Sequence, residues 1–332
     1  FPYTTLFRSV TGRQTSRQAT RQRTRKPSSQ RGQVRGRLGN RNRKRNRRHG
    51  PINALKRSWR KANWPTRIKM VLIPTVAVVV VVALVAGLVR FTNWRAQVRA
   101  AEAAQLELTR TYDFNPGNII SDGQFFNGSA MSQAEVQSFL DTQGGSLAAM
   151  TFDTSNESGE GLCADYTGTK GESAATIIDQ SARACKVSQK VLLTVMQKEQ
   201  HLVTAVDPSD YQLMAAMGLN CPDTADCDPA YAGFFRQVYG AAKRYRYYLE
   251  HEEQYGYTAH NLNYIQYHPN AACGGAQVYI ENKATALLYI YTPYQPNIAA
   301  LAAGNGTGDS CSSYGNRNFA LIYTSWFGSP RS

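Results

Sequence analysis

Glu199 is the side chain in this 332-residue sequence whose type and spacing best suit chemistry. If residues 189–203 form a helix, positions three, four and seven residues away share a face with Glu199. All of these positions are apolar: Leu192, Val195, Met196, Leu202 and Val203. Burying an ionised carboxylate is costly, so Glu199 should either keep its proton at a groove floor or pair with a cation or backbone amide. A carboxyl group that keeps its proton can act as a general acid on a glycosidic bond.

A second carboxylate could come from four aspartates that follow this helix in the chain. The candidates are Asp207, Asp210, Asp223 and Asp226. An inverting hydrolase needs such a group to activate water. The last two lie between Cys221 and Cys227, where an acidic loop could instead bind a cation or be a solvated turn.

Aromatic side chains could form the walls of a sugar-binding groove. Most of the 19 tyrosines lie beyond residue 230. Their rings can pack against sugar faces while the hydroxyls form hydrogen bonds, although any one of them could equally fill the core. The candidate contacts are Tyr264, Tyr267, His268, Tyr291 and Tyr294. No phosphate-binding loop and no HExxH motif occurs, so we expect neither cofactor nor metal.

Helices are predicted to position these residues, which gives a mainly α fold. A capping box of Ser132 and Glu135 begins a helix that should run to about Asp141. Further helices are expected over about 173–184, from the N-cap Ser188 to about Thr204, over 229–250 and near 281–291. Residues 142–171 are rich in Gly, Ser, Thr and acidic residues, and are predicted to form an irregular loop.

Six cysteines all lie beyond the apolar run of residues 70–89, and we expect three disulfides from them. The even number and the absence of a CxxC motif favour disulfides in an oxidising compartment over a metal site. Six cysteines allow 15 pairings. Pairing of neighbours is our choice: Cys163 with Cys185, Cys221 with Cys227, and Cys273 with Cys311.

An uncharged run from Met70 to Val89 predicts one transmembrane helix, because its 20 residues span about 30 Å as a helix. Residues 1–101 contain 25 Lys or Arg and no acidic residue, whereas 111–332 contain 12 basic and 21 acidic residues. This bias places the N-terminus in the cytoplasm and the following domain outside the plasma membrane. A cleaved signal peptide is the alternative, but no small-x-small cleavage site directly follows the run.

Residues 10–50 have almost no apolar side chains and are predicted to be disordered. Such a basic tail could bind anionic lipid or merely fix the topology. No specific nucleic-acid binding is expected, because the segment has no aromatic ring for base stacking.

The predicted organisation has four parts. They are a disordered basic tail over 1–67, a membrane anchor over 68–90, a helical stalk over 91–111 and an outer domain over 112–330. Residues 1–9 are interpreted as read-through from a sequencing adapter.

The segment Val191-Leu192-Leu193-Thr194-Val195-Met196-Gln197-Lys198-Glu199-Gln200 resembles the catalytic helix of the lysozyme superfamily, which includes lytic transglycosylases and glucosaminidases. The resemblance implies that Glu199 is the catalytic acid. Gln200 stands where transglycosylases have Ser, and Ala215-Ala216-Met217-Gly218-Leu219-Asn220 loosely matches a following Gly-Leu-Met-Gln segment. A lytic transglycosylase needs no second carboxylate.

Other segments, among them Asn118-Ile119-Ile120-Ser121-Asp122 and Tyr314-Gly315-Asn316-Arg317-Asn318-Phe319, resemble surface proteins of actinobacteria and other Gram-positive bacteria that are sometimes labelled haemagglutinin-like. The two resemblances imply a membrane-anchored, lysozyme-like domain that cleaves peptidoglycan or another cell-wall glycan. The alternative is a non-catalytic glycan-binding or scaffolding module on the same fold.

Overall fold

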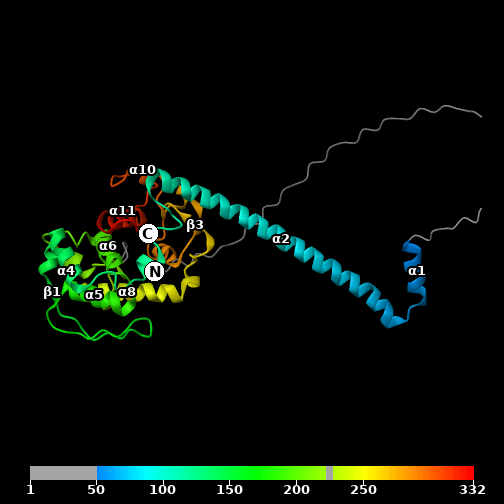
Figure 1. Cartoon of the computed structure of the whole chain (residues 1–332), viewed down its shortest axis with the longest axis horizontal. Coiled ribbons are helices and arrows are strands. Elements are labelled where there is room, and N and C mark those ends of the chain that lie inside the picture. The colour runs from blue at the N-terminus through cyan, green and yellow to red at the C-terminus, as the bar shows by residue number, and fades with distance from the viewer. Residues whose placement is uncertain (1–50, 222–226) are drawn as a thin grey trace, which may run out of the picture. The chain divides into compact units, whose positions relative to one another are not determined.

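The computed structural model describes residues 51–221 and 227–332 of a mainly helical chain, as predicted (Figure 1). The chain divides into two compact units, Phe1–Ala86 and Gly87–Ser332. The α-helices are α1 (Pro51–Lys61), α2 (Trp64–Tyr112), α3 (Asp122–Phe125), α4 (Gln133–Gln143), α5 (Ala174–Cys185), α6 (Gln189–Gln200), α7 (Asp210–Met214), α8 (Phe234–Glu250), α9 (Lys283–Tyr291), α10 (Ile298–Ala302) and α11 (Gly315–Phe327). The strands are β1 (Thr151–Phe152), β2 (Glu172–Ser173), β3 (Asn261–Gln266) and β4 (Gly275–Ile280), and short 3-10 helices lie at 146–149, 229–231, 252–254 and 271–273.

Helix α2 is 49 residues long and contains both the predicted anchor and the predicted stalk. By length and composition it can cross a membrane. It begins at Trp64, well before Pro74, so this proline lies inside the helix rather than in its first turns. Residues 51–61, which were included in the predicted disordered tail, form α1 instead. Pro51 begins that helix, at a position where its missing N–H costs nothing. Residues 1–50 lie outside the described residues.

The C-terminal turns of α2 belong to the second unit and pack onto the rest of it, so that Val98, Ala101 and Gln105 are buried. The Gln105 amide bonds both backbone groups of Tyr279: its Oε1 accepts from the Tyr279 N–H at 2.8 Å, and its Nε2 donates to the Tyr279 carbonyl at 3.2 Å. The folded domain therefore includes the last turns of α2.

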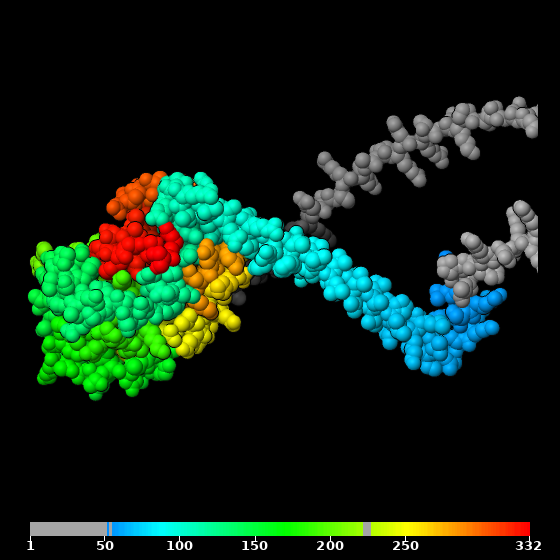
Figure 2. Space-filling view, in the orientation of Figure 1, coloured from blue at the N-terminus to red at the C-terminus, as the bar shows by residue number. Residues whose placement is uncertain are grey.

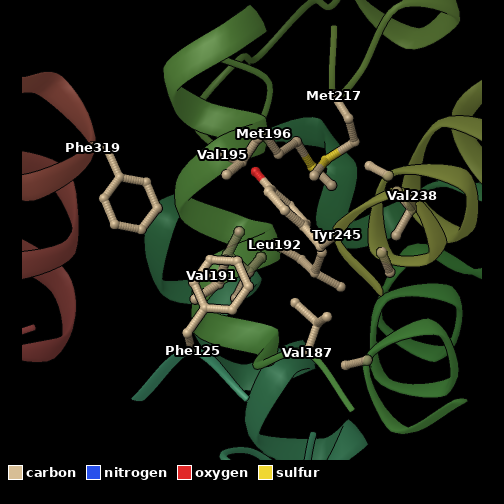
Figure 3. Close-up of a cluster of buried hydrophobic side chains, with 14 of the residues drawn as sticks. Phe125, Val187, Val191, Leu192, Val195, Met196, Met217, Val238, Tyr245 and Phe319 are labelled. Atoms are coloured by element: carbon tan, nitrogen blue, oxygen red, sulfur yellow. The ribbon is translucent and has the colours of Figure 1, made fainter. Parts of the chain in front are cut away.

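Helix α6 lies at the centre of the core (Figure 3). Every residue from Val191 to Met196 is buried, so this helix is enclosed on more sides than an amphipathic stripe predicts. It packs against α5 and α11, and α8 packs against α5. The side chains around it include Phe125, Val187, Val238, Tyr245 and Phe319 (Figure 3).

The predicted capping box is present, with the Ser132 side chain accepting from the Glu135 N–H and the Glu135 carboxylate accepting from the Ser132 N–H. The predicted helices near 173–184 and 281–291 are also present, as α5 and α9. Not predicted were α11 and the antiparallel hairpin of β3 and β4, which runs in register from Asn261 opposite Ile280 to Gln266 opposite Gly275. The fourth helix begins at Phe234, after a 3-10 turn, rather than at residue 229.

Three disulfides join neighbouring cysteines, which is the pairing chosen from the sequence: Cys163 with Cys185, Cys221 with Cys227, and Cys273 with Cys311. The first ties the irregular segment between β1 and β2 to the end of α5. The third ties the β3–β4 loop to the segment between α10 and α11. The first disulfide therefore anchors an irregular loop to a helix, and the third joins two loops.

Candidate functional site

Glu199 is the penultimate residue of α6, and the helix ends where His201 adopts a left-handed conformation with φ of 53°. The helix therefore stops at Gln200, not at Thr204 as predicted. The five apolar residues expected on the face of Glu199 are fully buried, from Leu192 to Val203. The Glu199 side chain itself is 27% exposed. It thus lies at the open end of a buried stripe, where solvent can reach the carboxylate.

Lys198 forms an ion pair with Glu199, between Nζ and Oε1. Its side chain is only 7% exposed. The ammonium also donates to the Thr292 hydroxyl at 3.2 Å and lies 5.6 Å from the centre of the Tyr291 ring. Tyr291, the last residue of α9, and Thr292, which follows it, therefore hold the ammonium of Lys198 against the Glu199 carboxylate.

Gly218 lies against Glu199 on the side of the carboxylate that carries Oε2. Its φ is +69°, and a Cβ built on it would lie 3.3 Å from Glu199 Oε2. The buried Gln237 fixes this loop, because its Oε1 accepts from the N–H groups of Met217 and Leu219 at 3.1 and 3.0 Å. The backbone therefore approaches the carboxylate closely, at a position that favours glycine.

Tyr245 and Tyr291 stack with ring centres 5.1 Å apart beside this loop. Burial raises the pKa of both hydroxyls well above the usual range, and the negative charge of Glu199 adds to each effect. The Tyr291 hydroxyl donates to the Met217 carbonyl. The Tyr245 hydroxyl points toward Met196 and Met217 (Figure 3) and has no hydrogen-bond partner among the residues that the structure describes. Both hydroxyls stay neutral at ordinary pH and can donate.

A cavity of about 340 Å³ lies between α8, Tyr231 and the segment of Glu160 and Leu162. Its walls include Tyr231, Tyr247, Tyr255, Lys243 and Arg244. Gln237 links Tyr231 to the loop of Gly218, because its Nε2 donates to the carbonyls of both Leu219 and Tyr231 at 2.9 Å. Glu160 also lines the cavity and pairs with Lys243 at 3.5 Å, so the aromatic rings with Arg244 are the groups that suit a sugar.

The aspartates predicted as second carboxylates are not brought to Glu199 by any described contact. Asp207 lies in the loop after α6, and Asp210 is the first residue of α7. Both are exposed. Asp223 and Asp226 lie outside the described residues.

The predicted tyrosines separate into two groups. Tyr291 belongs to the Glu199 site, whereas Tyr264 lies on β3 and Tyr267 follows it. Burial raises the pKa of Tyr267, and the nearby Tyr264 adds a smaller effect in the same direction. Tyr264 is 55% exposed. Tyr294 bridges to Gln266 at the end of the same strand. His268 accepts from the Asn270 N–H at 3.0 Å within the hairpin turn, so it has a local structural contact.

Sequence reasoning gave no role to Lys198, Tyr245 or Arg244. Lys198 was visible only as part of the helix motif, and adjacent helix residues do not normally face each other. Tyr245 and Arg244 come from α8, and nothing local marks Tyr245 as a neighbour of Glu199 or Arg244 as a wall of the cavity. The loose motif around Gly218 was the one available signal for the approach of this loop to Glu199.

The fold and the site define a mainly helical, disulfide-bonded domain that follows a helix able to cross a membrane. Such a domain is membrane-anchored or secreted. Residues 118–332 match the family described as LasA, N-terminal domain, and the chain belongs to this family. The match covers all three disulfides and Glu199. No curated protein and no solved structure matches the chain.

Proposed function

We propose that the outer domain cleaves the glycan strand of peptidoglycan or a related cell-wall polymer, with Glu199 as the general acid. The observation that carries this proposal is the setting of Glu199: a solvent-accessible carboxylate at the end of a buried stripe, held against the backbone of Gly218. The tyrosine-lined cavity supports a sugar ligand. The resemblance of α6 to the catalytic helix of the lysozyme superfamily adds to this support.

In the proposed reaction, Glu199 gives its proton to the glycosidic oxygen, and the bond from that oxygen to the anomeric carbon breaks. The electron pair leaves with the oxygen. Glu199, now ionised, can remove a proton from a hydroxyl of the same sugar, which then closes on the anomeric carbon. Alternatively, one of the aspartates after α6 activates water. In either route the Lys198 ion pair must open before Glu199 can carry the proton.

Lys198 favours a second candidate, a glycan-binding or scaffolding module without catalysis. A buried ammonium in contact with Glu199 pairs an ionised carboxylate, which is a structural role for both residues. In that case the tyrosine-lined cavity would hold the glycan, and Glu199 would only support the α6–α9 contact.

The test compares the full chain with Glu199→Gln, both purified in detergent, on peptidoglycan embedded in a gel. Glu102→Gln is the matched control, because Glu102 is exposed on α2 and lines neither cavity. We expect clearing by the parent and the control, and none by Glu199→Gln at an unchanged melting temperature. An inactive parent chain that still sediments with cell walls would support the binding module. Loss of folding in Glu199→Gln would make Glu199 structural.

The product distinguishes the two routes. A 1,6-anhydro sugar end means that Glu199 acts alone. A reducing end means that a second carboxylate takes part, and single Asn variants of Asp207, Asp210, Asp223 and Asp226 would then identify it.

We further propose a single-pass plasma-membrane protein with a cytoplasmic N-terminus, whose basic tail contacts anionic lipid. Support comes from the charge difference across the apolar part of α2 and from the disulfides after it. A reporter fused at residue 110 should be exported, and one fused at residue 60 should stay inside. The reverse pattern would refute this topology.

A further inference from the structure

A larger cavity, of about 540 Å³, lies apart from the tyrosine-lined one. It is lined by the end of α2, by Gln197 of α6, by α10 and the turn after it, and by α11. In Figure 2 the teal end of α2 and the red α11 lie side by side. Its apolar walls include Phe114, Leu321 and Trp326, and polar groups come from Thr204, Thr324 and Ser325. Its volume suits a small organic molecule.

Arg317 in the wall of this cavity is a buried cation without a carboxylate partner among the described residues. The residue is 5% exposed. Its Nη1 donates to the carbonyls of Ala300 and Gly306 at 2.8 and 2.9 Å, and its Nε and Nη2 donate to Asn318 Oδ1 at 3.1 and 3.0 Å. The guanidinium lies 4.4 Å from the centre of the Tyr314 ring. These partners are all neutral, so the positive charge is not compensated.

The free-energy cost of burying the unpaired charge of Arg317 points to a ligand that would neutralise it. Burial lowers the pKa of the Arg317 guanidinium from its usual value, and no carboxylate opposes that effect. Four of the five guanidinium N–H groups are used, which leaves one on Nη2 for a further acceptor. The other charged residue of the wall, Asp113, is already paired with Arg331. Buried charges are normally paired.

We propose that this cavity binds a small organic monocarboxylate with an apolar body. The carboxylate accepts from Arg317, and the apolar body packs on Trp326, Phe114 and Leu321. One uncompensated cation matches one negative charge, which favours a monocarboxylate over a phosphate dianion. The site is independent of the Glu199 chemistry.

The test uses the full chain in detergent, labelled with 5-fluorotryptophan. The sequence has four tryptophans, and Trp326→Phe assigns the fluorine signal of the one that lines the cavity. We expect phenylacetate to shift the Trp326 signal saturably, and the uncharged phenylacetamide to leave it in place. N-acetylphenylalanine is tested in the same way. If it shifts the Trp326 signal at lower concentrations than phenylacetate does, the natural ligand is the terminal carboxylate of a peptide.

Two variants tie the response to the cavity. Arg317→Gln should weaken phenylacetate binding at least tenfold, but the loss of its carbonyl contacts could also unfold the loop after α10. Thr324→Glu avoids that problem, since Thr324 is exposed and the new charge repels the anion at the wall. The matched control is Thr142→Glu, at an exposed threonine of α4. An equal response to phenylacetamide, no response to phenylacetate, or undiminished binding by Thr324→Glu would overturn the proposal.

Discussion

Gly218→Ala tests whether the geometry around Glu199 serves activity. The new methyl group would lie 3.3 Å from Glu199 Oε2 and 3.4 Å from Cγ and Cδ. Ordinary contacts between carbon atoms are about 3.5–4.0 Å, so the carboxylate must move by roughly 0.3–0.5 Å. A misplacement of about 1 Å typically costs about 100-fold in rate, which scales to a loss of roughly 4- to 10-fold here.

The same substitution also has a backbone cost. A φ of +69° is unfavourable for alanine by roughly 1–2 kcal/mol, and this lowers the melting temperature of a domain of this size by about 2–8 °C. Gly144→Ala separates the two effects. Gly144 ends α4 with φ of 72°, and a Cβ there would have no neighbour within 4 Å.

The assay measures the initial rate of release of soluble glycan from peptidoglycan, beside thermal unfolding, for both variants. We expect similar melting temperatures for the two, and a rate loss only for Gly218→Ala. Equal rates in the two variants would refute the reasoning, because the contact with Glu199 would then have no catalytic consequence.

Two further predictions concern stability. Gln105→Ala removes two hydrogen bonds to the Tyr279 backbone and should lower the free energy of unfolding by about 2–3 kcal/mol, a fall of roughly 4–12 °C in melting temperature. The control Gln97→Ala, on the exposed face of α2, should change the melting temperature little. Equal effects of the two substitutions would contradict the role of Gln105. Burial raises the pKa of Tyr248 and Tyr323 to about 12, while the unfolded chain releases these protons near pH 10. The contribution of these two side chains to stability against urea should therefore be complete below pH 10 and decline between about pH 10 and 12, with the part of the tyrosinate absorbance that belongs to buried tyrosines appearing only on unfolding. Ionisation of all 19 tyrosines in the native protein near pH 10 would contradict it.

Local signals in the sequence predicted several elements well. The hydrogen bonds of Ser132 and Glu135 involve neighbours in the chain, so a four-residue pattern is enough to locate the start of α4. The apolar face of Glu199 follows from helix periodicity, and all five of its residues are buried. The end of α6 could not be predicted in this way, because His201 adopts the left-handed conformation without the glycine that usually marks it.

Contacts between distant segments were beyond sequence reasoning. The strand Asn261–Gln266 has polar side chains at several positions, and its partner lies beyond a turn, so the pairing depends on register rather than on local preference. The Lys198 ion pair depends on Thr292 and Tyr291, nearly a hundred residues away. The same holds for Tyr245, which reaches the site only because α8 packs beside α9.

The burial of the last turns of α2 has a consequence for proteolytic release. Cleavage between Arg90 and Gln97, an almost wholly exposed stretch, would separate the apolar segment from a product that keeps Val98, Ala101 and Gln105 in their packed positions. Cleavage after Gln105 would instead shed a product that has lost the side chain bonded to Tyr279. The exposed turns before Val98 are therefore the place where a protease could set free an intact, diffusible domain.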